Sequence, residues 1–382
     1  MKNFHSGSYV KQSGGYKSFS PTLVHRLWSI DDPRTIRLLG RANRLLGALE
    51  VYTSTIPDVE SFLQLYTTQE AAASSKIEGT QTSIDEALLP SEQIAPEAWA
   101  DWQEVVNYRK ALEFAVKRIQ ELPLSSRLIR EVHQILMDSV RGQHKQPGEF
   151  RRSQNWIGGA TVQSARFIPP AHTEIAHLMS DIEQLIHDEN NLTPILIKAA
   201  ILHYQFETIH PFLDGNGRTG RVLIVLYLMQ EQLLSYPIFP ISDFLERLRP
   251  TYYELLDRVR THNEMKRWVT FFLEGTIEVC EQTLESLKGI VALREEIRQE
   301  VIPTFGARAA NAQQLIQSLY HQPIVSIEQV ATIIGKTYPT ANKLVMELVE
   351  KKVLVPSSEK SRYRRLFTFR RYLDLFQTPI TP

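Results

Sequence analysis

The stretch from His210 to Arg221 has the residue types of a phosphate-binding loop. It reads His-Pro-Phe-Leu-Asp-Gly-Asn-Gly-Arg-Thr-Gly-Arg, and helical patterns precede and follow it. Gly215, Asn216 and Gly217 can turn successive backbone N–H groups toward one point, which makes a nest for an anion. The following helix aims the positive end of its dipole at the same point, with Arg218 in its first turn. These features predict a cradle for a triphosphate.

Three further side chains of this stretch suit the chemistry of a bound triphosphate. Arg221 follows Arg218 by three residues and therefore shares its helix face. Asp214 offers a carboxylate of the kind that binds Mg²⁺ together with substrate phosphates, and Mn²⁺ could take its place. His210 is the nearby side chain whose ordinary pKa suits a general base near neutral pH. Each feature alone is weak, but eight fixed identities at roughly 5% each coincide on the order of once in 10^10 windows.

This stretch resembles the signature of the Fic family, H-P-F-x-D/E-G-N-G-R-x-x-R, and matches it at every fixed position. The resemblance implies an all-helical core and transfer of AMP from ATP to a Tyr, Ser or Thr hydroxyl of a target protein. By position, His210 would deprotonate that hydroxyl, Asp214 would hold the metal ion, and Arg221 would grip the γ-phosphate. Phe212 would be a buried anchor. The nucleotide-binding residues implied by the signature are Asp214, Gly215, Asn216, Gly217, Arg218, Thr219, Gly220 and Arg221.

The resemblance also implies functions for residues outside the signature. The stretch Asn155–Val162 with Phe167–Pro170 is similar to the family's flap, a hairpin that would align the target backbone by strand addition. Ile157, Gly158 and Gly159 would then lie beside the nucleotide. Tyr252 and Asn263 occupy positions where family members contact the adenosine.

The segment Ser74-Ser75-Lys76-Ile77-Glu78-Gly79 fits the family's inhibitory pattern, S/T-x-x-x-E-G/N. Ser74 and Glu78 are four residues apart on one helix face, and Gly79 is placed to end that helix. The resemblance implies that Glu78 pairs with Arg221 in place of the γ-phosphate and holds the nucleotide in an unproductive pose. An Arg–carboxylate pair shielded from solvent is strong enough to compete with one phosphate contact. The alternative is an exposed glutamate at a helix end.

The composition bounds the class of protein that carries these residues. The 382 residues are 43% hydrophobic and 23% charged, which allows a packed core and favours two or three domains. Basic and acidic residues balance at 43 each, so no global charge draws the chain to nucleic acid or membrane. No apolar run reaches the roughly 18 residues of a membrane helix, and the first residues lack a signal peptide's apolar segment. The single cysteine, Cys280, excludes an intramolecular disulfide. We expect a soluble, cytoplasmic protein.

Hydrophobic periodicity places these motifs on helices. Glycine is scarce at 17 residues, which favours long helices. The first 30 residues are expected to form an extended, partly mobile arm, and Gly142–Pro170 a loop with a short hairpin. Helices are predicted from Pro33, over Val59–Ile77, Ala98–Gln120, Thr173–His187, Thr193–Ile209 and Arg218–Leu234, and onward to Gln299.

The expected fold class is mainly α, with a Fic-type helical core, a small β-hairpin flap, an N-terminal helical domain and a C-terminal winged helix. The predicted domains are an N-terminal domain with the inhibitory helix (1–120), the catalytic core (121–275), a helical linker (276–302) and the winged helix (303–382). The last of these follows from helices over Ala307–Tyr320, Ser326–Gly335 and Thr337–Lys351 and two short strands, Val353–Val355 and Arg365–Phe369.

The C-terminal region supports a second hypothesis, a DNA-binding regulator. Lys336–Arg371 carries ten basic and three acidic residues, which fits either a nucleic-acid surface or a solvated face. In the first case the third helix would approach a groove and the wing would touch phosphates. The residues in question are Thr337, Thr340, Asn342 and Lys343 on the helix and Arg362, Arg364 and Arg365 on the wing.

Other enzyme reactions also remain open on the same cradle. A Fic relative could transfer a phosphoryl or phosphocholine group, or remove AMP. The intact Asp214, Gly217 and Arg221 favour ordinary triphosphate binding with attack at the α-phosphorus and release of pyrophosphate. Self-modification and a homodimer are implied by the resemblance alone.

Overall fold

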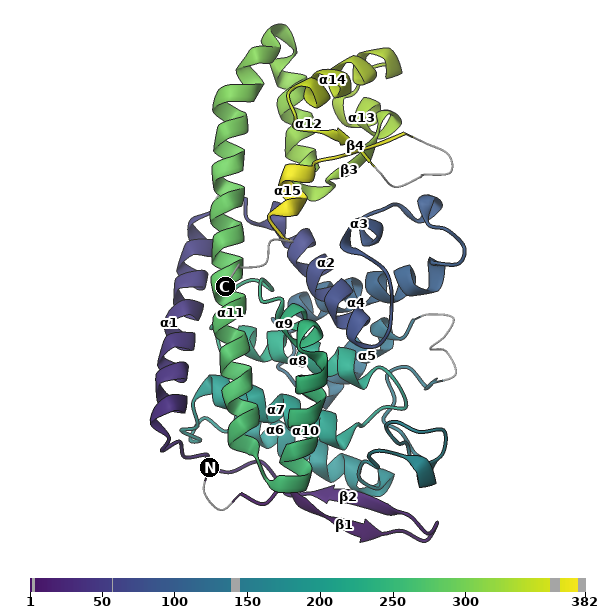
Figure 1. Cartoon of the computed structure of the whole chain (residues 1–382), viewed down its shortest axis with the longest axis vertical. Helices are drawn as coiled ribbons and strands as arrows, with labels where there is room; N and C mark the ends of the chain where they lie inside the picture. The colour runs from purple at the N-terminus through teal and green to yellow at the C-terminus, as the bar shows by residue number, and fades with distance from the viewer. Residues whose placement is uncertain (2–3, 57, 139–144, 358–364, 377–382) are drawn as a thin grey trace.

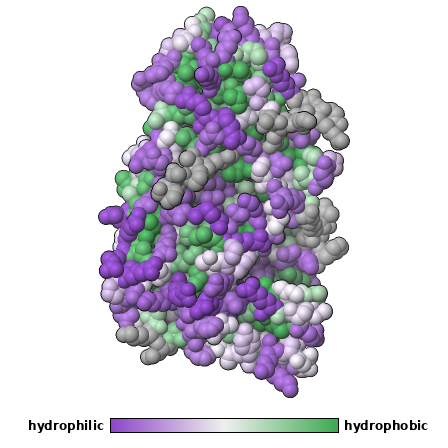
Figure 2. All heavy atoms as spheres, viewed as in Figure 1, coloured by the Kyte–Doolittle hydropathy of each residue, from purple (hydrophilic) through white to green (hydrophobic). Residues whose placement is uncertain are grey.

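The structure is a computed structural model that describes residues 1, 4–56, 58–138, 145–357 and 365–376 (Figure 1). Most of these residues are helical, and the strands form two small antiparallel sheets, β1–β2 and β3–β5–β4. The mainly α fold predicted from the sequence is therefore confirmed. Hydrophilic side chains cover most of the face shown in Figure 2, with apolar side chains scattered between them.

The elements follow in this order along the chain. The longer helices are α1 (Pro33–Thr55), α2 (Glu60–Ile77), α4 (Trp99–Arg118), α5 (Ser126–Leu136), α6 (Ile175–His187), α7 (Ile195–Ile209), α8 (Asn216–Gln230), α10 (Arg249–His262), α11 (Met265–Glu296), α12 (Ala309–His321), α13 (Ile327–Ile334) and α14 (Tyr338–Glu350). The short helical elements are α3 (Ile84–Ala87), η1 (Ser91–Gln93), η3 (Val162–Ser164), η4 (His172–Glu174), α9 (Ile241–Arg247), η5 (Ile297–Val301), η6 (Ile302–Arg308) and α15 (Arg370–Asp374). The strands are β1 (Gly7–Lys11), β2 (Lys17–Pro21), β3 (Ile324–Ser326), β4 (Val355–Pro356) and β5 (Leu366–Thr368).

Helices α7 and α8 form the centre of the core and pack against each other. Every residue of α7 from Leu196 to Ile209 is buried, as is nearly all of α8. A helix that is buried all round needs mostly apolar residues all round, and both sequences have them apart from a few polar positions. The site therefore sits on two helices that the whole core holds in place.

Helix α11 runs along one side of the molecule beside α1 (Figure 1). It reaches the C-terminal unit, which consists of α12–α15 and β3–β5. Its 32 residues span about 48 Å at 1.5 Å per residue. The predicted domain boundary at residue 275 falls inside this continuous helix, at Gly275. A Cβ there would lie 2.5 Å from the Phe244 ring, so the glycine serves close helix packing.

The N-terminal segment is a packed β-hairpin, and the prediction of a partly mobile arm is wrong. β1 and β2 pair in antiparallel fashion, and the Phe19 N–H donates to the Ile168 carbonyl at 2.9 Å. Beyond the hairpin, the Val24 N–H donates to the buried Asp181 carboxylate at 2.6 Å. Phe4, Phe19, Val24 and Trp28 of this segment are buried in the core, whereas Tyr9, Val10, Leu23 and Leu27 are exposed.

The C-terminal unit contains the elements that the sequence predicted, in the predicted order. Ser326 caps α13 in a capping box with Gln329, and Gly335 ends the helix at φ +61°. The strands β4 and β5 are shorter than predicted, and β3 joins them on the other side of β5. Whether this unit works as a winged helix stays a prediction.

The C-terminal unit packs on the first half of α2 through aromatic side chains. The Phe62 ring lies 5.6 Å from Tyr320 and 6.3 Å from Tyr372, and Tyr66 lies 4.8 Å from Phe376. The Gln69 side chain donates to the Phe376 carbonyl at 3.1 Å. The same helix carries the predicted inhibitory residues at its other end.

Replacing Tyr372 by alanine is expected to lower the free energy of unfolding by about 3 kcal/mol, because a fully buried aromatic side chain is removed. Urea unfolding would measure the loss. Tyr338→Ala is the matched control, since that tyrosine is 50% exposed and should change stability little. Equal losses in the two variants would contradict the packing described here.

Among the described residues, no helix has both the length and the apolar character to cross a membrane.

Candidate active site

A short loop joins α7 to α8 and carries the predicted catalytic residues. His210 ends α7 with φ +51°, and Gly215 precedes α8 with φ +73°. A Cβ at Gly215 would lie 2.6 Å from the Met137 sulfur, so only glycine fits this turn. The Asn216 side chain closes the loop, since it donates to the Phe212 carbonyl at 2.9 Å and accepts from the Phe212 N–H at 2.8 Å.

His133 supports this loop from α5, a helix that the sequence patterns did not predict. Its ring stacks on Phe212 at a centroid distance of 3.6 Å, which confirms Phe212 as a buried anchor. The Gly148 N–H donates to Nδ1 at 2.9 Å, so Nε2 carries the proton and donates to the Asp214 carbonyl at 2.9 Å. Burial lowers the pKa of His133 to about 4, and the ring is neutral at pH 7.

Arg151 holds the other side of the loop and was also not predicted. Its guanidinium donates to the carbonyls of His210 at 2.9 Å, Ser153 at 3.0 Å and Pro170 at 2.6 Å. Burial lowers the pKa of Arg151 to about 10, so it stays charged at neutral pH. The Asn155 amide adds a bond to the Phe212 carbonyl at 2.9 Å. Arg151 thereby ties the loop to both ends of the predicted flap.

The two arginines of the signature lie on the buried side of α8. Arg218 is 7% exposed and pairs with Glu104 of α4 at 3.2 Å. Arg221 is fully buried. Within the described part of the chain, the buried atoms Nε of Arg218 and Nη1 of Arg221 have no hydrogen-bond partner. Buried donors without partners are rare, and here they leave two N–H groups for an anion.

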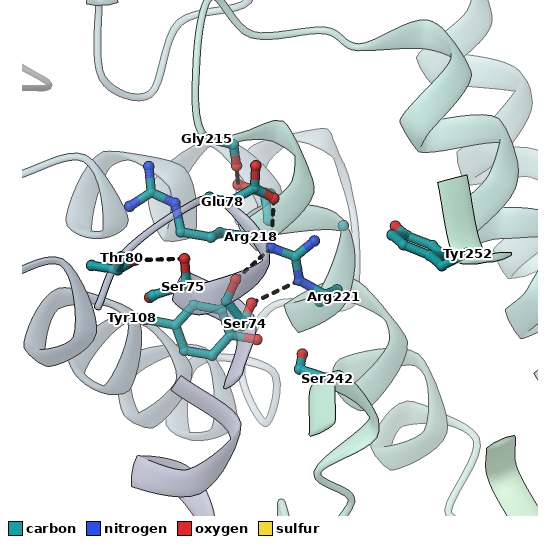
Figure 3. Close-up of polar contacts among 12 residues, drawn as sticks. Ser74, Ser75, Glu78, Thr80, Tyr108, Gly215, Arg218, Arg221, Ser242 and Tyr252 are labelled. Carbon is teal, nitrogen blue, oxygen red and sulfur yellow. Dashed lines mark hydrogen bonds and ion pairs between the residues drawn. The ribbon is translucent and has the colours of Figure 1, made fainter. Parts of the chain in front are cut away.

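Glu78 and Ser74 reach Arg221 from the end of α2 (Figure 3). Arg221 Nε donates to the Ser74 hydroxyl at 2.7 Å, and Nη2 donates to the Ser74 carbonyl at 2.9 Å. Nη2 also donates to Glu78 Oε1 at 2.8 Å, across 143 residues of sequence. The predicted contact between Glu78 and Arg221 is therefore present in the structure. The Glu78 N–H bonds to the Ser75 carbonyl where the helix ends, and Gly79 follows with φ +110°.

The Glu78 carboxylate lies over the glycine turn of the predicted cradle. A Cβ at Gly217 would be 2.3 Å from Glu78 Oε1 and 3.0 Å from Arg221 Nη1. A carboxylate oxygen thus lies directly beside Gly217, the last residue of the predicted nest. Burial disfavours the charged forms of Glu78 and Arg221, but the attraction between their opposite charges outweighs this effect. The pKa of Arg221 is raised and the pKa of Glu78 is lowered.

A buried polar group contacts α2 one turn before the predicted inhibitory residues. The Tyr108 hydroxyl donates to Glu70 at 2.9 Å, and the Ser242 N–H donates to the same carboxyl group at 3.0 Å. Burial raises the pKa of Glu70 to about 7. These contacts connect α2 to α4 and α9 one turn before Ser74.

His210 is a neutral imidazole at the edge of the cradle. Burial, followed by the nearby charge of Arg151, lowers its pKa to about 4. Its buried Nδ1 has no hydrogen-bond partner among the described residues. A neutral imidazole can accept a proton, and it does not have to lose one first at pH 7.

Asp214 fits a metal ion that is shared with phosphates. Its side chain is exposed, and one oxygen accepts from the Gly215 N–H at 2.7 Å, which leaves the second oxygen for a ligand. Residues 1, 4–56, 58–138, 145–357 and 365–376 contain no group of three His, Cys, Asp or Glu side chains that could hold an ion. A single carboxylate is the arrangement in which Mg²⁺ takes its other ligands from water and phosphate.

Two residues of the signature have other roles than the predicted contact with nucleotide. The Thr219 hydroxyl donates to the Gly215 carbonyl at 2.9 Å, inside α8. A Cβ at Gly220 would lie 2.4 Å from Glu207 Oε1, so this glycine lets α8 approach α7. Both residues shape the helix that carries the arginines. Asn216 likewise uses its side chain to close the loop, so only its backbone N–H remains for a phosphate.

The residues predicted beside the adenosine are also engaged in protein contacts. His203 Nδ1 donates to the Gly220 carbonyl at 3.0 Å, so its Nε2 accepts from the Tyr252 hydroxyl at 2.9 Å. Tyr252 is 1% exposed. Asn263 Oδ1 accepts from the Ser6 N–H at 2.7 Å, which differs from the predicted adenosine contact. The sequence could not reveal this, because Ser6 belongs to the segment predicted as a mobile arm.

The predicted flap is a loop with a single antiparallel bridge. Ile157 donates to the Phe167 carbonyl at 2.8 Å, and Phe167 donates back at 3.1 Å. Gly158 and Gly159 turn the chain with φ +69° and +82°. A Cβ at Gly159 would lie 2.3 Å from the Ser164 carbonyl oxygen, so the turn is too tight for a longer ladder.

Comparison with known proteins places the chain in a family. Residues 36–117 match the Fic/DOC family N-terminal domain, and residues 123–228 match the Fic/DOC family domain. Protein adenylyltransferase Fic of Drosophila grimshawi is 33% identical over 172 residues, which cover 44% of this chain and 31% of that protein. The chain thus spans about a third of the length of the curated relatives it matches.

Solved structures share the fold at lower identity. A Fic family protein from Desulfovibrio desulfuricans superposes with a TM-score of 0.55 at 19% identity, over 90% of this chain and 98% of that one. A Fic domain containing signaling protein from Bacteroides thetaiotaomicron gives 0.53 at 19% identity, over 67% and 97%. Residues 36–117 and 123–228 of this chain therefore belong to the Fic/DOC family.

Proposed function

We propose that this protein is a protein adenylyltransferase that transfers AMP from ATP to a Tyr, Ser or Thr hydroxyl and is inhibited by its own Glu78. The observation that carries the proposal is the position of the Glu78 carboxylate, over Gly217 and on Arg221. A carboxylate on an arginine beside a glycine nest marks a phosphate site. The drosophilid relatives named protein adenylyltransferase supply the reaction class.

The residues of the loop suit each part of this reaction. His210 would take the proton of the acceptor hydroxyl, whose oxygen attacks the α-phosphorus of ATP. The bond between the α-phosphorus and the bridging oxygen breaks, and pyrophosphate leaves with that oxygen. The nest and the unpaired N–H groups of Arg218 and Arg221 would hold the phosphates. Such a site works mainly by positioning and by stabilising charge.

Asp214 would hold a Mg²⁺ ion together with the phosphates. When bound, the ion would offset part of the negative charge of the triphosphate. Ile157 and the flap glycines would lie over the nucleotide, and the flap edge would align the acceptor chain.

Mass spectrometry of the Glu78→Gly variant incubated with ATP and magnesium tests the reaction. Transfer of AMP and transfer of phosphate add different masses, and the modified residue is read from the fragments. Modification of the chain itself would also reveal self-modification. Phosphoryl transfer, phosphocholine transfer from a suitable donor, or removal of AMP from a modified protein would each refute the proposal in its present form.

Gly217→Ala, made in the Glu78→Gly background, is expected to lower ATP affinity at least about tenfold, which corresponds to about 1.4 kcal/mol. The added methyl group would occupy the nest, 3.0 Å from Arg221 Nη1. Calorimetric titration with ATP measures the change. Gly47→Ala is the control, because a Cβ there meets nothing within 4 Å. Unchanged affinity in Gly217→Ala would mean that phosphate does not enter the nest.

A second candidate function, DNA binding by the C-terminal unit, has one supporting observation. Residues Lys336–Thr340 and Lys343, at the start of α14, are exposed. Against it, Arg370 pairs with Asp85 and Arg371 with Glu296, so part of the basic excess is neutralised. Arg362 and Arg364 lie outside the described residues. A steep fall of DNA affinity with salt would support this function.

A further inference from the structure

Arg260 is a partly buried cation beneath the flap that neither the signature nor the inhibitory pattern includes. It lies near the end of α10, and the Ser6 hydroxyl donates to its carbonyl at 3.0 Å. The guanidinium carbon lies 3.9 Å from the centroid of the Phe167 ring. Phe167 is the residue that closes the flap on Ile157. Arg260 therefore supports the flap from the side of the core.

The guanidinium of Arg260 lacks an ionic partner. Its Nε is buried, and within the described part of the chain neither a hydrogen bond nor an ion pair engages the side chain. Asp257, Glu207, Tyr204 and Tyr9 are the titratable groups near enough to attract it. A desolvated cation without a hydrogen-bonded anion is costly, so its presence beneath the flap points to a ligand that completes it.

The position of Arg260 relative to His210 indicates which part of a ligand it meets. Its charge acts on the imidazole of His210 and on Glu207. Asp257 and Tyr253 lie one and two turns earlier on the same face of α10, and Tyr253 is in electrostatic reach of Glu78. This face of α10 thus lies within electrostatic reach of Glu78 at Tyr253 and of His210 at Arg260, where it also contacts Phe167 of the flap.

We propose that Arg260 binds the non-bridging oxygens of the α-phosphoryl group of a nucleotide, and this inference rests on the proposed function. Arg218 and Arg221 serve the outer phosphates from α8. The α-phosphorus must lie beside His210, because the imidazole holds the hydroxyl that attacks it. Arg260 approaches the same point from beneath the flap and offers N–H donors to the oxygens that gain charge as the hydroxyl oxygen bonds and pyrophosphate departs.

The test compares AMP with adenosine, which differ by the α-phosphate alone. Both affinities are measured by calorimetry in the Glu78→Gly parent and after adding Arg260→Met or Arg260→Lys. In the Met variant, AMP affinity should fall about tenfold to a hundredfold, as expected for a lost bond to a charged group. Adenosine affinity should stay within about twofold, and the Lys variant should regain part of the AMP affinity, since it keeps the charge.

A purely structural role of Arg260 gives a different result. If the side chain only clamps the flap, AMP and adenosine affinities fall together, and the inference is overturned. Phe167→Leu removes the stacked ring and keeps the arginine, so the ratio of AMP to adenosine affinity should hold in that variant. Arg258→Met is the matched control, because Arg258 pairs with Glu264 away from the flap.

The parent variant separates this inference from the proposed function. A parent that binds no ATP or AMP refutes the proposed function itself. A parent that binds AMP and transfers it, beside an Arg260→Met variant with unchanged AMP affinity, refutes only the role of Arg260. Thermal unfolding of each variant shows whether it is folded, and Arg260→Lys supplies the comparison if Arg260→Met is not.

Discussion

Replacing Glu78 by glycine is expected to raise ATP affinity and AMP incorporation about 10- to 100-fold. In the resting protein, Glu78 accepts a hydrogen bond from buried Arg221 at 2.8 Å and fills the space above Gly217. A triphosphate must displace this carboxylate before it can use the arginine. A charge-assisted bond of this kind contributes about 1.5–3 kcal/mol, which corresponds to roughly that range in affinity. Labelled ATP and autoradiography of the protein measure the incorporation.

The same variant should be less stable without ligand and should respond more strongly to ATP. Removing Glu78 leaves the fully buried Arg221 with the oxygens of Ser74 alone. An arginine deprived of its anion in a buried site destabilises the fold, and a phosphate restores the partner. The melting temperature of Glu78→Gly should therefore lie below that of the parent without ATP and rise further when ATP and magnesium are added.

Two further variants test whether the carboxylate itself is the inhibitor. Glu78→Gln keeps the size of the side chain and loses its charge, so it should give partial release. Glu246→Gln is the control, because Glu246 pairs with the exposed Lys76. If Glu78→Gly incorporates no more AMP than the parent while it still binds ATP, Glu78 is not an inhibitor.

The contact between Glu78 and Arg221 could be predicted because both residues belong to short patterns with fixed spacing. The pair could be expected without knowing the path that the chain takes across the 143 positions that separate them. The supports of the loop could not be found in this way. His133 and Arg151 act through bonds to backbone carbonyls, and any segment that passes close by could supply such donors. No spacing in the sequence records that proximity.

The fold shows the same division between local and distant information. Helix periodicity and the capping box of Ser326 depend on neighbours in sequence, and the helices and the cap are present. The N-terminal hairpin depends on contacts such as Phe19 with Ile168 and Ser6 with Asn263, more than 100 residues apart. Its many glycines and serines are typical of a mobile segment. The hairpin is stabilised by contacts with the core that it covers, and local composition does not reveal those contacts. The adenosine contact expected of Asn263 comes from the resemblance alone, which does not include its hydrogen bond with Ser6.

Replacing His210 in the Glu78→Gly background is expected to lower the rate of AMP transfer about 10²- to 10⁴-fold, the usual loss when a general base is removed. ATP affinity should stay within about threefold, because the proposed phosphate contacts are with α8 and the nest. His210 has φ +51°, a conformation that strains alanine. His210→Asn should therefore accompany His210→Ala, since asparagine tolerates this backbone and cannot act as the base. His177→Ala, an exposed histidine of α6, is the control.

The pH profile adds a separate check on His210. Burial and Arg151 lower its pKa to about 4 in the protein without ligand, so the imidazole is the basic form throughout the neutral range. With respect to this group, kcat/KM should be flat from pH 6 to 8 and should fall only as the pH drops toward about 4. The charge of Glu78 raises the pKa of His210. Removing Glu78 should therefore shift the fall of kcat/KM at acid pH to lower pH. If kcat/KM of His210→Asn still falls at the same acid pH, another group causes the fall, and the imidazole is not the base.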